Sequence, residues 1–353
     1  MKKILSLSII VLLSLQAFSK AAYPQRIPKD KPIEFTETWG YVMSDRMEEF
    51  NSSMPITDLC HFAVSIDCYG ELDTIPDITK IPEDFKGRKH LVAICESRSL
   101  AHFVLDPKYG VNKKIIDDLV NAAKDYDGLQ IDFEIIPKKD SQNFKTFLKI
   151  LRKKLRKDQM FTICVPARLK EMENDIFDYK LMAPYVDRIF IMAYDEHWST
   201  SSAGPVAGLD WVDKIIDHSL NTIPKEKIII GIPFYGRTWQ NKSLGKAWYN
   251  SGINRIMREN KINDISRKNE VAYFEFKTEV KVRGYFDDAY SLVQRLKRIK
   301  NKDLDKVGFW RLGQEDPLFW NYVKTPYESE PLIIAEKWLV FFCFVFWIID
   351  LQY

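Results

Sequence analysis

The residues best suited to chemistry lie in one short segment, residues 127–134, which reads Asp-Gly-Leu-Gln-Ile-Asp-Phe-Glu. Apolar side chains at 129, 131, 133 and 135 alternate with Gln130, Asp132 and Glu134. On a β-strand this alternation puts all the polar groups on one side. Burying carboxyls is costly unless they have partners, so a strand used only for packing would not carry them. The segment therefore predicts either a functional strand lining a barrel interior or an edge strand with one wet face.

Two carboxyls on the same face, two residues apart, are close enough to interact. They should share a proton and differ in function. Glu134 is nearer the carboxyl end of the strand, where barrel enzymes keep their active sites. We therefore expect Glu134 to be a general acid, with its pKa raised by Asp132 behind it.

These residues need a scaffold, and the chain alternates short β-branched and aromatic runs with amphipathic stretches. Such alternation is typical of parallel α/β folds. The eight predicted strands are Glu34–Val42, Leu59–Asp67, His90–Cys95, Gly128–Ile135, Met160–Pro166, Arg188–Tyr194, Lys227–Pro233 and Val307–Leu312. Predicted helices include Ile115–Lys124, Ser141–Leu155 and Leu209–Leu220. Eight strands favour a closed (β/α)8 TIM barrel.

The interval between the seventh and eighth strands is too long for one helix. It contains a predicted hairpin of residues 271–276 and 280–285, followed by Asp288 as an N-cap of a helix. We therefore expect a small α+β insertion at about residues 245–286 within a barrel of residues 33–325.

The composition is that of a globular protein. The net charge of the 353 residues is only +3 and the basic residues form no single stripe, so we expect no nucleic-acid partner. The five cysteines, at 60, 68, 95, 164 and 343, have neither metal-ligand nor disulfide-scaffold spacing. We expect them to be mainly small buried hydrophobic residues.

Both ends of the chain carry apolar runs. Lys2 and Lys3 precede a largely apolar stretch and the small residues Ala17 and Ser19, the layout of a signal peptide at 1–19. The alternative is an uncleaved anchor. The tail, 326–353, contains twelve apolar residues at 338–349, fewer than the roughly 20 of a membrane-spanning helix. It is either a membrane or interfacial anchor or an aberrant terminus. We expect a secreted or cell-envelope protein.

Three further stretches extend the pattern of the 127–134 segment in chain order. They are Ile191-Met192-Ala193-Tyr194-Asp195, Gly231-Ile232-Pro233-Phe234-Tyr235-Gly236-Arg237 and Gly308-Phe309-Trp310-Arg311-Leu312-Gly313. Together with Tyr285-Phe286-Asp287-Asp288, the set resembles glycoside hydrolase family 18, the chitinase-like (β/α)8 barrels. The likeness spans roughly residues 33–325.

Finer features resemble one branch of that family. Residues 194–198, 204–207 and 211–212 are more similar to bacterial spore cortex-lytic N-acetylglucosaminidases than to typical chitinases. Gln130 also stands where chitinases keep their first Asp, as is common in that branch. No peptidoglycan-binding LysM repeat is visible in the sequence.

The resemblance implies a substrate-assisted retaining mechanism, in which the 2-acetamido oxygen of the sugar attacks the anomeric carbon. Glu134 would protonate the leaving oxygen and later activate water. Asp132 would orient the acetamido N–H, Tyr194 would donate to the acetamido oxygen, and Trp310 would form a floor under the sugar.

Other residues near these motifs have two interpretations. Tyr194 and Asp195 could be an ordinary strand end with a helix cap, and Trp310 could be core. Tyr235 and Arg237 either line the sugar cleft or tie the barrel rim. Gln130, Asp195, Glu196 and Trp198 are the remaining candidates for substrate binding. The histidines, His197 among them, lack metal-ligand spacing, and we expect neither metal nor cofactor.

Three functions remain open on the sequence. The first is an exported, monomeric hydrolase of β-1,4-linked N-acetylglucosamine polymers, either peptidoglycan or chitin. The second is a non-catalytic, lectin-like barrel, since some relatives lost the acid. The third is an unrelated barrel acting as a scaffold, which would leave the ordered motifs unexplained. The presence of Glu134, Asp132 and Tyr194 favours the enzyme.

Overall fold

The computed structural model describes residues 27–240, 244–277 and 279–326. The predicted signal peptide at 1–19, the apolar run at 338–349 and Cys343 lie outside the described residues. Among the helices that the structure does describe, none is long and apolar enough to cross a membrane.

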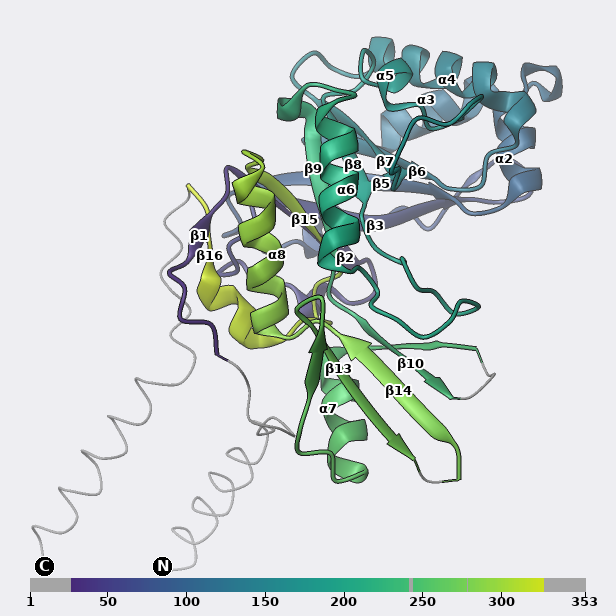
Figure 1. The fold of residues 1–353 in the computed structure, drawn as a ribbon. Helices are drawn as coiled ribbons and strands as arrows, with labels where there is room; N and C mark the ends of the chain where they lie inside the picture. The colour runs from purple at the N-terminus through teal and green to yellow at the C-terminus, as the bar shows by residue number, and fades with distance from the viewer. Residues whose placement is uncertain (1–26, 241–243, 278, 327–353) are drawn as a thin grey trace, which may run out of the picture.

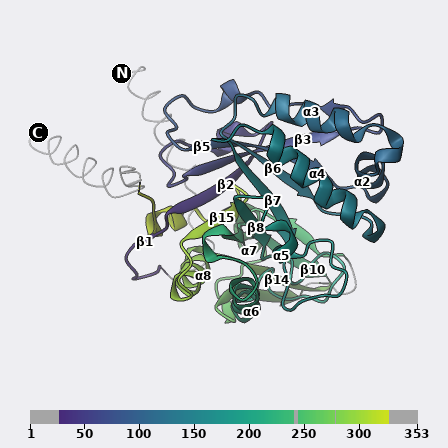
Figure 2. The ribbon, with the colours of Figure 1, turned by 90° about the horizontal axis from the view of Figure 1, so that it is seen from above.

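Eight parallel strands close into a barrel, as the sequence predicts (Figures 1 and 2). They are β2 (Glu37–Met43), β3 (Asp58–Ile66), β5 (Arg88–Cys95), β6 (Gly128–Phe133), β7 (Met160–Pro166), β8 (Arg188–Met192), β9 (Ile228–Pro233) and β15 (Lys306–Trp310). Their order is β2-β15-β9-β8-β7-β6-β5-β3, and pairing of β2 with β3 completes the ring.

Helices cover the outside of the barrel. They are α2 (Arg98–Leu105), α3 (Asn112–Ala122), α4 (Ser141–Lys154), α5 (Tyr179–Met182), α6 (Leu209–Leu220) and α8 (Ala289–Asn301). The 3-10 turns are η1 (Met47–Glu49), η2 (Ile78–Lys80), η3 (Pro107–Tyr109), η4 (Lys138–Asp140), η5 (Lys225–Lys227) and η6 (Pro317–Tyr322). Two short pairings, β1 (Ile33–Glu34) with β16 (Val323–Lys324) and β4 (Leu72–Asp73) with β3, complete the fold. Helix α2 is absent from the sequence-based prediction.

The insertion after β9 is an α+β unit, and it is larger than the predicted hairpin. Its antiparallel sheet has the order β11-β10-β14-β13-β12. The strands are β10 (Gly236–Gln240), β11 (Lys246–Trp248), β12 (Ser266–Lys268), β13 (Val271–Lys277) and β14 (Lys281–Phe286), and the helix is α7 (Asn250–Glu259). Because β10 belongs to this sheet, the unit begins at Gly236, before the expected residue 245. Asp288 caps α8 as predicted, accepting from the Ser291 N–H.

Two apolar layers hold the barrel together. Outward-facing residues such as Leu129, Ile131 and Phe133 pack against the helices, while Tyr41 and Cys164 belong to a separate cluster inside the barrel. Three of the cysteines, 60, 95 and 164, are buried as expected. Cys68 is the exception and is exposed, because it follows the end of β3 in a surface turn.

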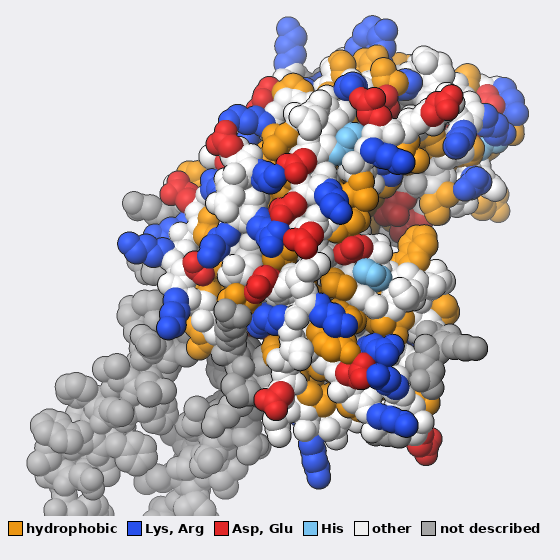
Figure 3. Space-filling view, in the orientation of Figure 1, with side chains coloured by type: hydrophobic (Ala, Val, Ile, Leu, Met, Phe, Trp, Pro, Cys, Tyr) orange, Lys and Arg blue, Asp and Glu red, His pale blue; other side chains and the backbone are white. Residues whose placement is uncertain are grey.

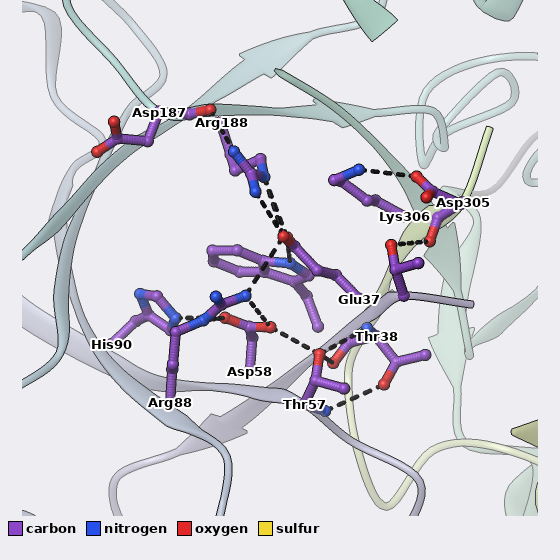
Figure 4. Close-up of polar contacts among 12 residues, drawn as sticks. Glu37, Thr38, Thr57, Asp58, Arg88, His90, Asp187, Arg188, Asp305 and Lys306 are labelled. Carbon is purple, nitrogen blue, oxygen red and sulfur yellow. Dashed lines mark hydrogen bonds and ion pairs between the residues drawn. The ribbon is translucent and has the colours of Figure 1, made fainter. Parts of the chain in front are cut away.

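Charged side chains close the end of the barrel formed by the strand N-termini (Figure 4). Arg188 Nη2 lies 2.6 Å from Glu37 Oε1, and Arg88 Nε lies 2.6 Å from Asp58 Oδ1. His90 Nε2 lies 2.8 Å from the same Asp58 oxygen. Burial raises the pKa of Asp58, but the hydrogen bonds and charges of His90 and Arg88 outweigh it and lower the pKa overall. This group of paired charges, the plug, therefore lies at the end of the barrel opposite the carboxyl ends of the strands.

Candidate active site

Strand β6 is a central strand, flanked by β5 and β7, so the edge-strand alternative is wrong. Its apolar side chains face the helices; the Phe133 ring lies 5.6 Å from the Phe147 ring. Gln130 and Asp132 are buried on the inner side, as the alternation predicts. Strand β6 ends at Phe133, two residues earlier than expected, and Ile135 is therefore turned outward and 41% exposed.

Asp132 lies inside the barrel just below its mouth. It is only 6% exposed, and its Oδ1 has no hydrogen-bond partner within the described part of the chain. Burial, with the nearby charges of Glu134 and Glu96, raises the pKa of Asp132 to about 8, while a hydrogen bond from the Cys164 thiol acts in the opposite direction. In the ligand-free protein Asp132 is therefore protonated at neutral pH.

Glu134 follows β6 at the mouth and is exposed, and its backbone N–H donates to the Cys95 carbonyl at 3.2 Å. Partial desolvation and the charges of Glu96 and Asp195 raise its pKa. The direction agrees with the sequence-based expectation, but the cause differs. Asp132 does not supply the raising charge, because it holds its own proton in this environment.

Glu96 is the important mouth residue that the sequence reasoning missed. Residues Ile94 and Cys95 of β5 pair with Asp132 and Phe133 of β6. Extending this register by one residue brings Glu96 beside Glu134. The available signal was its position directly after the third barrel strand, because the carboxyl ends of all eight strands converge at one mouth.

Gln130 lies deeper, below Asp132, and is completely buried. Its Oε1 accepts from the Tyr41 hydroxyl at 2.5 Å, and its Nε2 has no partner among the residues with described positions. Its complete burial argues against the predicted direct contact with substrate. Gln130 instead fixes Tyr41 across the barrel interior.

Tyr194 and Asp195 follow β8 at the mouth. The Tyr194 ring lies 6.4 Å from the Tyr235 ring. Burial and the neighbouring Cys164 and Asp132 hold the pKa of Tyr194 well above its usual range, so its hydroxyl keeps its proton. Tyr194 is thus a neutral donor beside the two carboxyls.

Asp195 adopts a left-handed backbone conformation with φ of 59°. Its Oδ1 accepts from the Tyr235 hydroxyl at 2.7 Å and from Arg237 Nη2 at 2.9 Å. Tyr235 and Arg237 therefore connect the barrel rim and hold Asp195 next to Glu134. This arrangement favours the rim interpretation of these two residues.

Trp310 ends β15 and is half-buried. Its ring meets the rings of Phe62 at 4.7 Å and Tyr41 at 5.4 Å, both in edge-on geometry. The ring is therefore anchored in the barrel interior while part of it remains accessible at the mouth.

The loop after Asp195 contains Glu196 and Trp198, two further candidates for substrate binding, and their environments differ. The Glu196 carboxylate accepts from the Gly208 N–H at 2.6 Å, at the start of α6. This contact gives Glu196 a role in closing the loop, and its predicted place in the substrate cleft stays a prediction. His197 contacts the Pro205 carbonyl at 2.8 Å, a structural role. Trp198 is 57% exposed and its ring is open to a ligand.

One group of potential metal ligands occurs in the described ranges: His102, Asp106 and Asp140, near α2. Lys139 Nζ lies 2.9 Å from His102 Nε2, and Lys108 Nζ lies 3.5 Å from Asp106. Ammonium groups thus already balance this cluster, and we assign it no metal.

The fold and the site together define a (β/α)8 barrel with carboxyls at its C-terminal mouth and an α+β insertion after the seventh strand. Residues 73–315 match the model of glycosyl hydrolases family 18. The match covers more than half of the chain, and the protein therefore belongs to glycosyl hydrolase family 18.

Individual relatives agree with this assignment. The chain is 33% identical over 138 residues to the uncharacterized glycosylase YvbX of Bacillus subtilis (strain 168), over 37% of this chain and 40% of the relative. It is 22% identical over 226 residues to the cortical fragment-lytic enzyme of the same organism, over 60% of this chain and 52% of that one. The chain thus spans about half or less of the length of these curated relatives.

Among solved structures, the spore cortex-lytic enzyme SleL of Bacillus cereus superposes with a TM-score of 0.74 and 18% identity. The superposition covers 84% of this chain and 76% of that chain. At this identity the similarity establishes the fold.

Proposed function

We propose that the protein is an exported glycoside hydrolase that cleaves β-1,4-linked, N-acetylglucosamine-containing glycans of the peptidoglycan or chitin type. One observation carries the proposal. A buried carboxyl with an unpartnered oxygen, Asp132, lies directly behind an exposed carboxyl, Glu134, at the carboxyl end of β6. A packing strand has no use for this pair, whereas acetamide-assisted hydrolysis needs one proton donor and one group that holds the acetamide.

In the proposed first step, the acetamido N–H of the sugar donates to the free Oδ1 of Asp132. This bond favours the ionised form of Asp132, so its proton can pass to the Glu134 side of the pair. Glu134 then protonates the glycosidic oxygen while the acetamido oxygen bonds to the anomeric carbon and the leaving sugar departs.

In the second step, the Glu134 carboxylate removes a proton from a water molecule, whose oxygen attacks the anomeric carbon. The bond to the acetamido oxygen breaks, and the configuration is retained. Tyr194 would donate to the acetamido oxygen, and Trp310 would support the sugar face. Asp195, held by Tyr235 and Arg237, supports the protonated state of Glu134 through its charge.

The decisive experiment compares sugar release from purified peptidoglycan and from chitin oligomers, for the wild type and Glu134→Gln. We expect hydrolysis of at least one substrate by the wild type, and a loss of roughly 10²–10⁴-fold in the variant, the usual contribution of general acid catalysis. Binding without hydrolysis by the wild type would support a lectin-like barrel instead. Near wild-type turnover of Glu134→Gln would place the acid elsewhere.

The retaining mechanism has its own test. A thiazoline analogue of the cyclised oxazolinium ion should inhibit, because the site is complementary to that state. Comparable hydrolysis of glucose oligomers, which lack the acetamido group, would refute acetamide participation.

Export and a monomeric state belong to the same proposal. Support for export comes from the basic, apolar and small-residue order of residues 1–19. Mass spectrometry of the protein outside the cell should give a mature N-terminus after Ser19, and sedimentation should give a monomer. Retention of residues 1–19 in a membrane fraction would favour the uncleaved anchor.

A further inference from the structure

The insertion concentrates positive charge. Residues 236–286 contain eleven Lys and Arg against five Asp and Glu, whereas the whole chain has a surplus of only three positive charges. The rest of the chain is therefore net negative, and acidic side chains lie set back in the hollow between barrel and insertion, while Lys and Arg are prominent over the insertion (Figure 3). The excess of positive charge thus belongs to the insertion and not to the barrel. It favours binding of an acidic ligand to the insertion.

The strand register shows which face of the insertion adjoins the active site. Arg237 of β10 pairs with Tyr285 of β14, which pairs with Tyr273 of β13. Residues paired directly across strands share a face, and Arg237 contacts Asp195 at the barrel mouth. The cross-strand row of Arg237, Tyr285 and Tyr273 therefore begins at the barrel mouth and runs outward along one face of the insertion sheet. The opposite face, with Phe274, packs in a cluster with α7.

Lys268 lies on this same face at the outer strand β12. Its Nζ is 4.4 Å from the centre of the Tyr273 ring and 5.6 Å from that of Tyr285, and it donates to the Tyr285 hydroxyl at 3.1 Å. It has no carboxylate partner in the described ranges of the chain. An exposed ammonium fixed over two rings, with further N–H groups to donate, is prepared for an anion.

Further along the same face the positive charge continues. Lys281 and Arg283 share a single carboxylate, Glu275, at 2.5 and 2.7 Å. Hydrogen bonds from Lys281, Tyr273 and Arg283 lower the pKa of Glu275 to about 2. Lys277 pairs with Lys281 across the strands and is exposed. The cationic face, defined as Lys268, Lys277, Lys281 and Arg283, thus keeps more positive than negative charge.

We infer that this cationic face binds the acidic substituents of a carboxylate-bearing amino-sugar polymer, with Lys268 as the residue that selects it over neutral chitin. The inference rests on the proposed function, because that function places a glycan in the mouth from which the chain would extend along the insertion. Peptidoglycan-type strands carry carboxylates on lactyl ethers or peptide stems, whereas chitin has no charge. Only the former gains charge-assisted hydrogen bonds from Lys268.

The test measures binding calorimetrically, in the Glu134→Gln background so that the glycan survives. Three ligands of equal length are compared: peptidoglycan-type strands with free carboxylates, the same strands with amidated carboxylates, and chitin oligomers. Lys268→Met should weaken binding of the free-carboxylate strands about two- to fivefold, the range of an exposed ion pair. Binding of the other two ligands should not change, and added salt should reduce the difference.

Lys246→Met is the matched control, because Lys246 lies in the same unit and pairs with Thr238, on the face opposite Arg237. It should leave all three affinities unchanged. Equal affinities for free and amidated strands, or equal weakening of all three ligands by Lys268→Met, would overturn the inference. Binding of an oligonucleotide as tightly as the acidic strands would also overturn it, since the face would then be an unselective basic surface.

Hydrolysis by the wild type is scored separately. Hydrolysis combined with charge-independent binding refutes this inference and leaves the proposed function standing. Charge-dependent binding without hydrolysis refutes the proposed function and leaves the inference standing.

Discussion

Glu134 sits among charges that control whether it carries a proton. Glu96 lies beside it, and Asp195 with its partner Arg237 follows β8, which is separated from β6 by β7. Like charges disfavour ionisation, so each neighbouring carboxylate helps Glu134 to remain protonated. A raised pKa is what a general acid needs in order to hold its proton until it reacts.

Glu96→Gln tests this arrangement. Removing the Glu96 charge should lower the pKa of Glu134, so the proton needed for catalysis is lost at a lower pH. The basic limb of the kcat/KM profile should move to lower pH, while the activity on the acidic side of that limb should stay near the wild-type value. Glu48→Gln, on the β2–β3 loop, is the control. A profile that superimposes on that of the wild type would show that Glu96 does not act on the acid.

Asp132 makes a different prediction, because the folded protein holds its proton up to about pH 8 while the unfolded chain releases it near pH 4. Between these values, rising pH favours the unfolded chain, which binds fewer protons. The side chain of the Asp132→Asn variant does not titrate, so its free energy of unfolding does not fall with pH for this reason. Relative to wild type, it should gain about 4 kcal/mol in unfolding free energy between pH 5 and pH 8.5, while losing activity.

Urea unfolding at the two pH values measures this gain. A pH-independent difference between Asp132→Asn and wild type would mean that Asp132 is ionised throughout this range. The pairing of higher stability with lost activity is expected for a buried carboxyl retained for catalysis.

At the scale of elements, the β8–α6 loop separates catalytic from structural carboxylates. Asp195 accepts from the rim pair Tyr235 and Arg237, while the next residue, Glu196, accepts from the N–H of Gly208, the residue just before α6. The backbone of Glu196 also donates to the Val206 carbonyl at 2.8 Å, which closes the loop. The neighbouring carboxyls of Asp195 and Glu196 therefore have different roles, one at the barrel rim and the other within the loop.

Glu196→Ala should accordingly lower the free energy of unfolding by about 1 kcal/mol, as for the loss of a helix-capping acceptor. The change in KM should be less than about twofold, since the carboxylate is used within the protein. Urea unfolding and steady-state kinetics measure both quantities. An unchanged stability with a clearly raised KM would return Glu196 to the substrate cleft.

At the scale of the whole molecule, the barrel has a reactive end and a stabilising end. Among the described residues, Asp132 and Glu134 at the mouth have no basic partner, whereas Glu37 and Asp58 at the opposite end are paired with Arg188 and Arg88. Pairing lowers the cost of burying these charges, and removal of Arg188 would leave the buried Glu37 with only Trp39 Nε1 at 3.0 Å and Arg88 at 3.4 Å.

Arg188→Met should therefore destabilise the protein by about 3 kcal/mol. The kcat/KM of the folded fraction should remain unchanged, because the plug lies at the end of the barrel opposite the mouth. Lys225→Met, which breaks the exposed pair with Asp303, should cost less than about 1 kcal/mol. Equal effects of the two variants in urea would show that the plug contributes no more than a surface ion pair.

The sequence by itself determined the barrel and showed that β6 is the strand that carries the two carboxyls. The alternation at 127–134 is a local, period-two pattern, and it specifies which side of β6 faces the helices without knowledge of any neighbour. The predicted limits of β7 and α6 also agree with the structure, because a continuous apolar run and an apolar stripe of helical period are likewise local patterns. The insertion was predicted only as a hairpin, because β10, β11 and β12 are too short to carry a pattern and form by pairing with longer strands.

Only the tertiary structure decided which groups interact at the mouth. The β5–β6 register brings Glu96 beside Glu134, and residues 40 positions apart in the chain join Asp195 to Tyr235. The proton on Asp132 could not be read from sequence, because it depends on burial and on distances to charges from other strands. Electrostatic interactions depend on separation in space, and a closed barrel brings together residues that the sequence keeps apart.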